Sequence, residues 1–179
     1  MFILILALPT QYFILYCIHN IKLISRSNSE GELATFLRTE RNAYHLKRDL
    51  HIPGNILFSD QCAMKTTDGS STSLIAGSAI GCGYIEGVGS QASFENIFSF
   101  LQLSVSTVLI ADGSNHCLRS LNRTTNQTLK YVGDCTNSGN RDGINAMLQH
   151  PGTLIHDMKN PGHILIAELD GALKSLATT

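Results

Sequence analysis

The residues best suited to covalent chemistry are four cysteines in the central part of the chain. Cys62 and Cys82 lie 20 residues apart, and Cys117 and Cys135 lie 18 residues apart. Four cysteines allow three connectivities, and the near-equal spacing favours the disulfides Cys62–Cys82 and Cys117–Cys135. The alternative is four reduced, buried thiols in a cytosolic protein. A fifth cysteine, Cys17, lies in an apolar N-terminal segment and is lost if that segment is cleaved.

A second kind of covalent chemistry is glycosylation. Asn122 and Asn126 each begin an Asn-x-Thr triplet, which is the acceptor pattern for N-linked glycans. Both triplets lie in a polar connection between two expected strands, residues 118–121 and 129–132, where a glycan fits. The alternative is chance, because the triplet is common in unglycosylated chains.

We identify no catalytic, cofactor-binding or metal-binding residue. There is no C-x-x-C and no Cys/His cluster with zinc spacing, and each of four histidines falls at an expected turn or connection: His116, His150, His156 and His163. The Gly-rich segment after Gly77 lacks the spacing of a nucleotide-binding loop. No nucleophile–base pair or carboxylate dyad is recognisable, so we expect no cofactor.

The elements that position these residues are short repeated strands. A run of β-favouring apolar residues at 108–112, a turn rich in Asp, Gly, Ser and Asn, and a second run at 118–121 predict a β-hairpin. Weaker copies occur upstream, at 56–60 and 64–66, and downstream, at 164–168 and 173–176. Each first strand ends in an acid (Asp60, Asp112, Glu168), and each second strand carries a cation (Lys65, Arg119, Lys174).

Glycines repeat with the hairpins. Gly77 and Gly133 are 56 residues apart, as are Gly87 and Gly143. Several short strands in a unit of roughly 40–56 residues are typical of β-propeller blades, and such units must stack because none can bury its sheet alone. The predicted fold class is therefore all-β.

Residues 53–179 resemble the NHL-repeat family of β-propellers. The resemblance rests on Glu86-Gly87, Ala92-Ser93-Phe94, residues 108–112, residues 115–119 and residues 129–133, and on a second copy at residues 141–152 and 166–168. It implies a partial propeller of about two to three four-stranded antiparallel blades of the secreted or extracellular type. The second copy departs from the pattern, since Leu169-Asp170 replaces the Asn-His pair.

The number of repeats is too small for a closed ring. Residues 53–179 hold two full units and part of a third, whereas closed propellers have about 4–8 blades. Either the chain is a fragment of a larger propeller, or further blades or another chain complete it.

The N-terminal segments are less regular. Residues 1–27 are strongly apolar but interrupted at Pro9, which favours a signal peptide, with an uncleaved hydrophobic anchor or a spurious start as alternatives. Residues 28–52 are expected to be a linker or the degenerate end of an earlier blade. Within them, residues 40–50 could form a short helix or such an end.

Composition narrows the functional classes. The net charge is −1 and only 15% of residues are charged, which excludes the basic footprint of a nucleic-acid surface. We expect the strand-end acids to cap turns and the repeated cations to meet a neighbouring blade's acid, with a cation-lined ligand surface as the alternative.

Together these features predict a secreted or extracellular, non-catalytic interaction module with an unknown protein ligand. A membrane-anchored form is the alternative location, and no other membrane contact is expected. Alternative functions are a fragment of a propeller lyase or hydrolase whose catalytic residues lie in missing blades, since the NHL-type family includes a zinc-dependent lyase, and a cytosolic scaffold with free thiols.

Overall fold

The computed structural model describes residues 12–17, 20–27, 32–35, 43–78 and 81–178, and their secondary structure consists of strands and two short 3-10 turns. The elements are β1 (Tyr12–Cys17), β2 (Asn20–Ser27), β3 (Glu32–Thr35), β4 (Ala43–Arg48), β5 (Ile56–Asp60), β6 (Ala63–Thr67), β7 (Thr72–Gly77), β8 (Gly87–Val88), η1 (Gly89–Gln91), β9 (Ile97–Gln102), β10 (Thr107–Asp112), η2 (Gly113–Asn115), β11 (Cys117–Asn122), β12 (Gln127–Gly133), β13 (Pro151–His156), β14 (His163–Glu168) and β15 (Leu173–Ala177).

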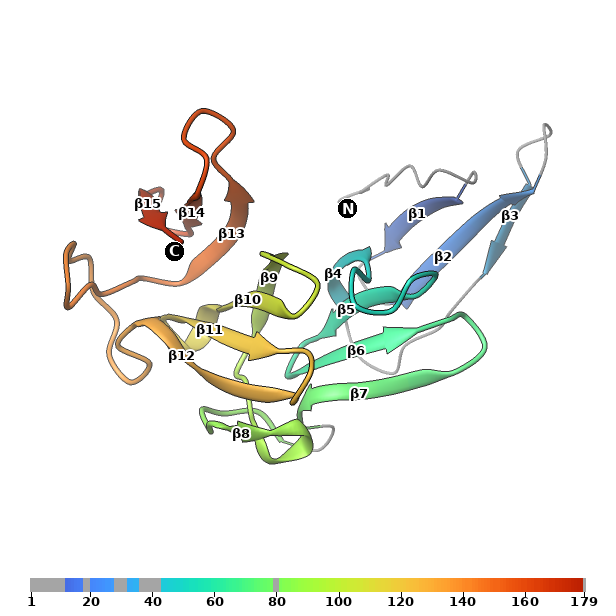
Figure 1. Ribbon diagram of the computed structural model, residues 1–179, viewed down its shortest axis with the longest axis horizontal. Coiled ribbons are helices and arrows are strands. Elements are labelled where there is room, and N and C mark those ends of the chain that lie inside the picture. The colour runs from blue at the N-terminus through green and yellow to red at the C-terminus, as the bar shows by residue number, and fades with distance from the viewer. Residues whose placement is uncertain (1–11, 18–19, 28–31, 36–42, 79–80, 179) are drawn as a thin grey trace.

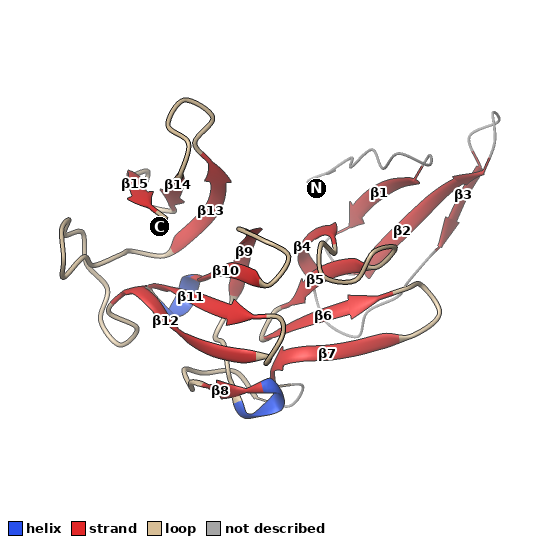
Figure 2. Cartoon of the chain, in the orientation of Figure 1, coloured by secondary structure: helices blue, strands red, loops and turns tan. Residues whose placement is uncertain are grey.

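The strands form four antiparallel sheets, in which consecutive strands are neighbours except that β8 pairs with β12. We call them sheet I (β1-β2-β3), sheet II (β4-β5-β6-β7), sheet III (β8-β12-β11-β10-β9) and sheet IV (β13-β14-β15). The sheets follow one another along an arc, with sheets I and IV at its two ends (Figure 1). Figure 2 shows that the described elements are strands joined by loops, with the two short 3-10 turns near β8 and β10. The architecture is all-β and resembles part of a β-propeller, as the sequence predicted.

The three predicted hairpins are confirmed, and they share one register. The apolar residue of the first strand faces the cation of the second in each copy: Phe58 with Lys65, Ile110 with Arg119, and Ile166 with Lys174. The outer strands expected near 73–76 and 128–132 are β7 and β12.

The predicted boundary at residue 53 is wrong. β4 pairs with β5 through Leu46 opposite Phe58, so sheet II begins at Ala43, and the alternative of a short helix over residues 40–50 is also wrong. β4 was missed because His45, Lys47 and Arg48 interrupt its apolar pattern.

The predicted signal peptide, residues 1–27, is described by the structure only from residue 12. Its described part forms β1 and β2, which pair from Tyr12 opposite Ser25 to Cys17 opposite Asn20, while residues 1–11 lie outside the described residues. Cleavage near residue 27 would remove both strands; whether it occurs stays a prediction. Among the described residues, no helix has the length and apolarity needed to cross a bilayer.

Two apolar layers hold the sheets together. Between sheets II and III lie Leu57, Met64 and Ile75 on one side and side chains such as Phe100 and Ile110 on the other. Between sheets III and IV, the layer contains four residues of sheet III and four residues of sheet IV or the connection before it: Leu101, Leu109, Ala111, Leu118, Leu148, Leu154, Ile164 and Ile166. Sheets II, III and IV therefore stabilise one another by packing face to face.

Two of the repeated glycines end the strand that follows the hairpin in sheets II and III: Gly77 ends β7 and Gly133 ends β12. Gly77 and Gly133 have φ of +100° and +99°. A Cβ on Gly133 would lie 2.8 Å from the His116 carbonyl oxygen, and one on Gly77 would lie 2.3 Å from the Cys62 carbonyl oxygen. The 56-residue spacing thus marks two places where backbone passes against backbone.

This close approach predicts a difference between two glycine substitutions. Gly143 has a similar φ of +93°, but no atom lies within 4 Å of its Cβ position. Gly143→Ala should cost about 1–2 kcal/mol of unfolding free energy from backbone strain alone, and Gly133→Ala about 1–3 kcal/mol more from overpacking. Urea unfolding of both variants tests this, and equal losses would show that the contact at Gly133 carries no strain.

Candidate binding surface

Two crossover loops connect sheet II to sheet III and sheet III to sheet IV, and the structure describes the first at residues 78 and 81–96 and the second at residues 134–150. Each is fixed near its start by a disulfide. Cys82 bonds to Cys62 beside the β5–β6 turn, and Cys135 bonds to Cys117 at the start of β11, with Cα atoms 5.3 and 5.0 Å apart. The predicted pairing is confirmed. Each disulfide closes a loop of about 20 residues, for which the chain-entropy model gives about 3 kcal/mol.

The first crossover loop also pairs with sheet III. Its strand β8 adds to the outer edge of β12, with Val88 opposite Gln127 and Gly87 opposite Thr128. The Glu86 carboxylate accepts the backbone N–H of Lys130 at 2.7 Å. The loop therefore covers part of the edge that β12 would otherwise expose.

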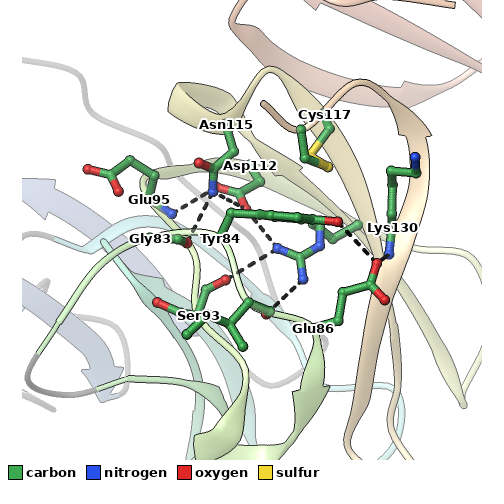
Figure 3. A network of polar contacts seen from close by, with 12 residues as sticks. Gly83, Tyr84, Glu86, Ser93, Glu95, Asp112, Asn115, Cys117 and Lys130 are labelled. Atoms are coloured by element: carbon green, nitrogen blue, oxygen red, sulfur yellow. Dashed lines mark hydrogen bonds and ion pairs between the residues drawn. A yellow bond between two sulfur atoms is a disulfide. The ribbon is translucent and has the colours of Figure 1, made fainter. Parts of the chain in front are cut away.

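The centre of this arrangement is the guanidinium of Arg119, which is fully buried. Its Nη1 donates to Asp112 Oδ2 at 3.1 Å and to the Ser93 carbonyl at 3.2 Å, and its Nη2 donates to the Ile85 carbonyl at 3.0 Å. The ring of Tyr84 lies 4.6 Å from its Cζ. Figure 3 shows Tyr84 and Ser93, from the two ends of the loop, and Asp112 around this guanidinium.

The Asp112 carboxylate is held from several sides. Its Oδ1 accepts the Glu95 N–H at 2.9 Å, and its Oδ2 accepts a hydrogen bond from Asn115 at 2.8 Å. Burial raises the pKa of Asp112, while these hydrogen bonds and Arg119 oppose that rise. The sequence predicted that the acid caps its own turn; instead Asp112 caps the end of the crossover loop, and Glu168 accepts the Gln149 N–H in the same way at 3.0 Å.

The other two cations of the repeat are less enclosed. Lys65 pairs with Asp60 of its own hairpin, and Lys174 pairs with Asp142 of the preceding crossover loop at 2.6 Å. The expectation that each cation meets a neighbouring blade's acid is therefore wrong for Lys65 and Arg119. Because Arg119 is buried, it also cannot line a ligand surface.

Arg119 and Lys174 occupy equivalent positions with different burial, which allows a matched comparison. Arg119→Met leaves Asp112 as a buried charge without its cation and should cost about 3–5 kcal/mol of unfolding free energy. Lys174→Met breaks a pair whose acid is 88% exposed and should cost at most about 1 kcal/mol. Chemical denaturation measures both, and a similar loss in the two variants would contradict a central role for Arg119.

Two predicted turn histidines meet where sheet III contacts the chain entering sheet IV. The rings of His116 and His150 are edge-to-face with centroids 4.2 Å apart. His116 Nδ1 accepts the backbone N–H of His150 at 3.2 Å. The pKa of His116 is lowered from its usual 6.5, first by burial and second by the charge of His150. The sequence placed His116 in a hairpin turn and His150 in a connection but did not indicate this contact.

A lowered histidine pKa predicts loss of stability in acid. The folded state binds the His116 proton less readily than the unfolded state, so its contribution is complete above the unfolded pKa of about 6.5 and falls as the pH drops below it. His116→Asn keeps an acceptor and tolerates the left-handed φ of 56° at this position. We expect the variant to lose less stability than the parent between about pH 7.5 and 5.5 in thermal unfolding. If the stability of the variant depended on pH in the same way as that of the parent, His116 would not be the cause of the loss in acid.

The other two histidines of the sequence analysis, His156 and His163, do not contact this pair. His156 is exposed at the end of β13 and His163 begins β14. Within the described residues, no group of three or more His, Cys, Asp or Glu side chains is arranged to hold a metal ion.

The two glycosylation triplets flank the turn between β11 and β12: the first begins at Asn122, the last residue of β11, and the second ends at Thr128, within β12. Asn122 is exposed, and its Oδ1 accepts the N–H groups of Thr124 and Thr125 at 2.9 and 3.1 Å. Asn126 is partly buried with φ of 57°, while Thr128 is fully buried. Modification of either asparagine stays a prediction.

Sequence reasoning missed an ion pair that joins sheets II and III. Arg123 Nη1 and Nη2 donate to Asp49 Oδ1 and Oδ2, both at 3.0 Å, and Thr66 donates to the same carboxylate at 2.8 Å. Burial alone would raise the pKa of Asp49, but the hydrogen bonds from Arg123 and Thr66 hold it below its usual value. The two residues are 74 positions apart, and no local pattern marks them as partners.

The crossover loops combine fixed bases with exposed apolar side chains. Ile85 and Val88 in the first loop are 57% and 48% exposed, and Ile144 in the second is 103% exposed. Exposed side chains on anchored loops are suited to recognition, because little ordering entropy is lost on binding. We therefore regard residues 81–96 and 134–150 as the candidate binding surface.

Comparison with known proteins supports the fold alone. No protein-family model matches the sequence, and no curated protein matches it. Among solved structures, a protein of unknown function from Bacteroides thetaiotaomicron VPI-5482 is 21% identical with a TM-score of 0.74, over 93% of this chain and 44% of that chain. An auxiliary nutrient binding protein from Bacteroides ovatus ATCC 8483 is 15% identical with a TM-score of 0.74, over 96% of this chain and 46% of that one. A second auxiliary nutrient binding protein, from B. thetaiotaomicron, is 16% identical with a TM-score of 0.64, over 87% and 42%. The chain spans less than half the length of these structures.

Proposed function

We propose that this chain is an extracellular, non-catalytic interaction module built from NHL-type propeller blades, and that it binds a protein through its two crossover loops. The observation that carries the proposal is the double anchoring of the first loop, by the Cys62–Cys82 disulfide and by the buried Arg119. Anchoring of this kind holds the loop in one conformation before a ligand binds.

Two observations support the extracellular location without reference to the apolar residues 1–27. Disulfides persist in oxidising compartments and are rare in the cytosol, and two are present. The exposed turn carrying Asn122 is accessible for a glycan. A binding role agrees with the nutrient-binding description of two similar structures. The propeller-enzyme alternative requires catalytic residues in further blades, and no contact described above favours it.

The proposal is tested on chain expressed through a secretory pathway. We expect a glycosidase-sensitive mass shift that Thr124→Ala with Thr128→Val abolishes. Val suits position 128 because the Thr128 hydroxyl is buried and has no hydrogen-bond partner among the described residues. Intact-mass measurement also shows whether residues 1–27 are retained. An unglycosylated secreted chain would remove the sequon argument, and free alkylation of all cysteines would contradict the oxidising location.

Photo-crosslinking of the secreted chain tests whether the crossover loops bind a protein. A photo-crosslinking amino acid at Ile144 should capture an extracellular protein, whereas the same group at Ser70, exposed in the β6–β7 turn, should not. Substituting Ile85→Ser should reduce capture at position 144 if both loops contact one ligand. Equal capture from positions 144 and 70 would contradict recognition by the crossover loops.

A further inference from the structure

Four aspartates of the chain are each followed by a glycine: Asp68-Gly69, Asp112-Gly113, Asp142-Gly143 and Asp170-Gly171. In such a pair the backbone nitrogen of the glycine can attack the carboxyl carbon of the aspartate, because glycine has no Cβ to crowd the approach. The attack needs an aspartate side chain that is free to rotate and a glycine N–H that is not donated elsewhere. The four pairs differ in both respects.

The pair at Asp112 meets neither condition. Its carboxylate is fully buried and bonded to Arg119, and the Gly113 N–H donates to the Asn96 carbonyl at 2.8 Å. A Cβ on Gly113 would lie 1.9 Å from the ring of Phe98. The backbone at this pair therefore has no room to rearrange.

The pair at Asp68 is exposed but held by local hydrogen bonds. The Gly69 N–H donates to Thr67 Oγ1 at 3.0 Å, and Asp68 Oδ1 accepts the N–H of Ser70 at 2.8 Å. Both the attacking nitrogen and the carboxylate are thus engaged, and their hydrogen bonds must break before the nitrogen reaches the carboxyl carbon.

The pair at Asp170 is exposed and held in the same way. The Gly171 N–H donates to the Glu168 carbonyl at 3.1 Å, and Asp170 Oδ1 accepts the N–H of Ala172 at 3.0 Å. Exposure alone therefore does not distinguish a reactive pair from a protected one.

The pair at Asp142, in the second crossover loop, meets both conditions. The Asp142 side chain is 88% exposed. Its carboxylate bonds to Lys174, 32 residues away, at 2.6 Å, and to no backbone N–H of the described residues. The Gly143 N–H has no hydrogen-bond acceptor in that part of the chain either, and no atom lies within 4 Å of the Gly143 Cβ position.

We propose that Asp142 is a modification site, at which aspartate isomerises spontaneously to isoaspartate. The Gly143 nitrogen attacks Cγ of the protonated Asp142 carboxyl, and a C–N bond forms. One water leaves, made of the carboxyl hydroxyl and the amide proton. The resulting five-membered imide takes up one water at the former backbone carbonyl carbon, where the C–N bond breaks. The main chain then runs through Cβ and Cγ, and the carboxylate is attached to Cα. The reaction consumes no oxidant or reductant.

The isomerisation changes the second crossover loop at one point. It adds one atom to the backbone before Gly143 and shortens the side chain that carries the carboxylate, so the contact of Asp142 with Lys174 is lost. The fully exposed Ile144 lies two residues further on. This loop therefore changes as the protein ages, whereas Asp112, which holds the first loop, is protected by burial.

The test is peptide mapping of the folded chain, with both disulfides intact, after prolonged incubation in mildly acidic buffer. Isoaspartate should accumulate at residue 142 at least about fivefold faster than at residue 68 or 170, because two hydrogen bonds must break at each of those sites. Asp142→Glu should abolish the product, since the attack would have to close a six-membered ring. Asp170→Glu is the matched control and should leave the product at residue 142 unchanged.

The same incubation in guanidinium chloride shows whether the fold sets this preference. In the unfolded chain the four pairs should react at similar rates, including Asp112, which should not react when folded. Absence of isoaspartate at residue 142 of the folded chain overturns the proposal. Equal or faster reaction at residue 68 or 170 of the folded chain, or the same preference for residue 142 in the unfolded chain, also overturns it. None of these outcomes bears on ligand recognition, which the crosslinking at Ile144 tests separately.

Discussion

The rest of the structure depends on one constraint, which is that an antiparallel sheet with two apolar faces needs a neighbour on each side. β5 and β10 are buried on both faces, and the layers on either side of sheet III contain most of the large buried side chains. At about 25 cal/mol per Å² of apolar surface, this packing exceeds the contribution of any single ion pair described above. Sheets II, III and IV therefore lie in a row because packing against a neighbour buries their apolar faces.

Ion pairs fix how the sheets and loops are positioned within that row. The Asp49–Arg123 pair joins sheets II and III at one end of their strands, whereas Arg119 fixes the first crossover loop at the other end. Buried pairs of this kind add little net stability compared with apolar side chains, but breaking one is costly. Their effect is to exclude alternative positions of the loop. The apolar layers thus stabilise the fold, whereas Arg123 and Arg119 fix the positions of the sheets and of the first crossover loop.

Much of the fold was predictable because its signals are local. The hairpin at 108–121 and its copies show as apolar runs ending in acids, and equal spacing was enough to pair the cysteines. The strand β4 was missed because His45 and Lys47 lie on a half-covered face, so its sequence lacks the apolar run of β5. The stacking of Tyr84 on Arg119, the pairing of Asp49 with Arg123 and the contact of His116 with His150 were also missed. These contacts join residues 34 to 74 positions apart, and only the packing of sheets brings them together.

The repeat also explains why the two crossover loops differ. The first is held by a disulfide, by the buried Arg119 through the carbonyls of Ser93 and Ile85, and by the pairing of β8 with β12. The second has an equivalent disulfide, but its cation is Lys174, whose partner Asp142 is largely exposed. A lysine presents a single ammonium group, whereas a guanidinium donates in several fixed directions. Lys174 therefore holds the second loop at Asn140 and Asp142, which lie close together in sequence, while Arg119 joins both ends of the first. The two loops thus carry equivalent disulfides but differ in the cation that holds them, and the fully exposed Ile144 lies on the second.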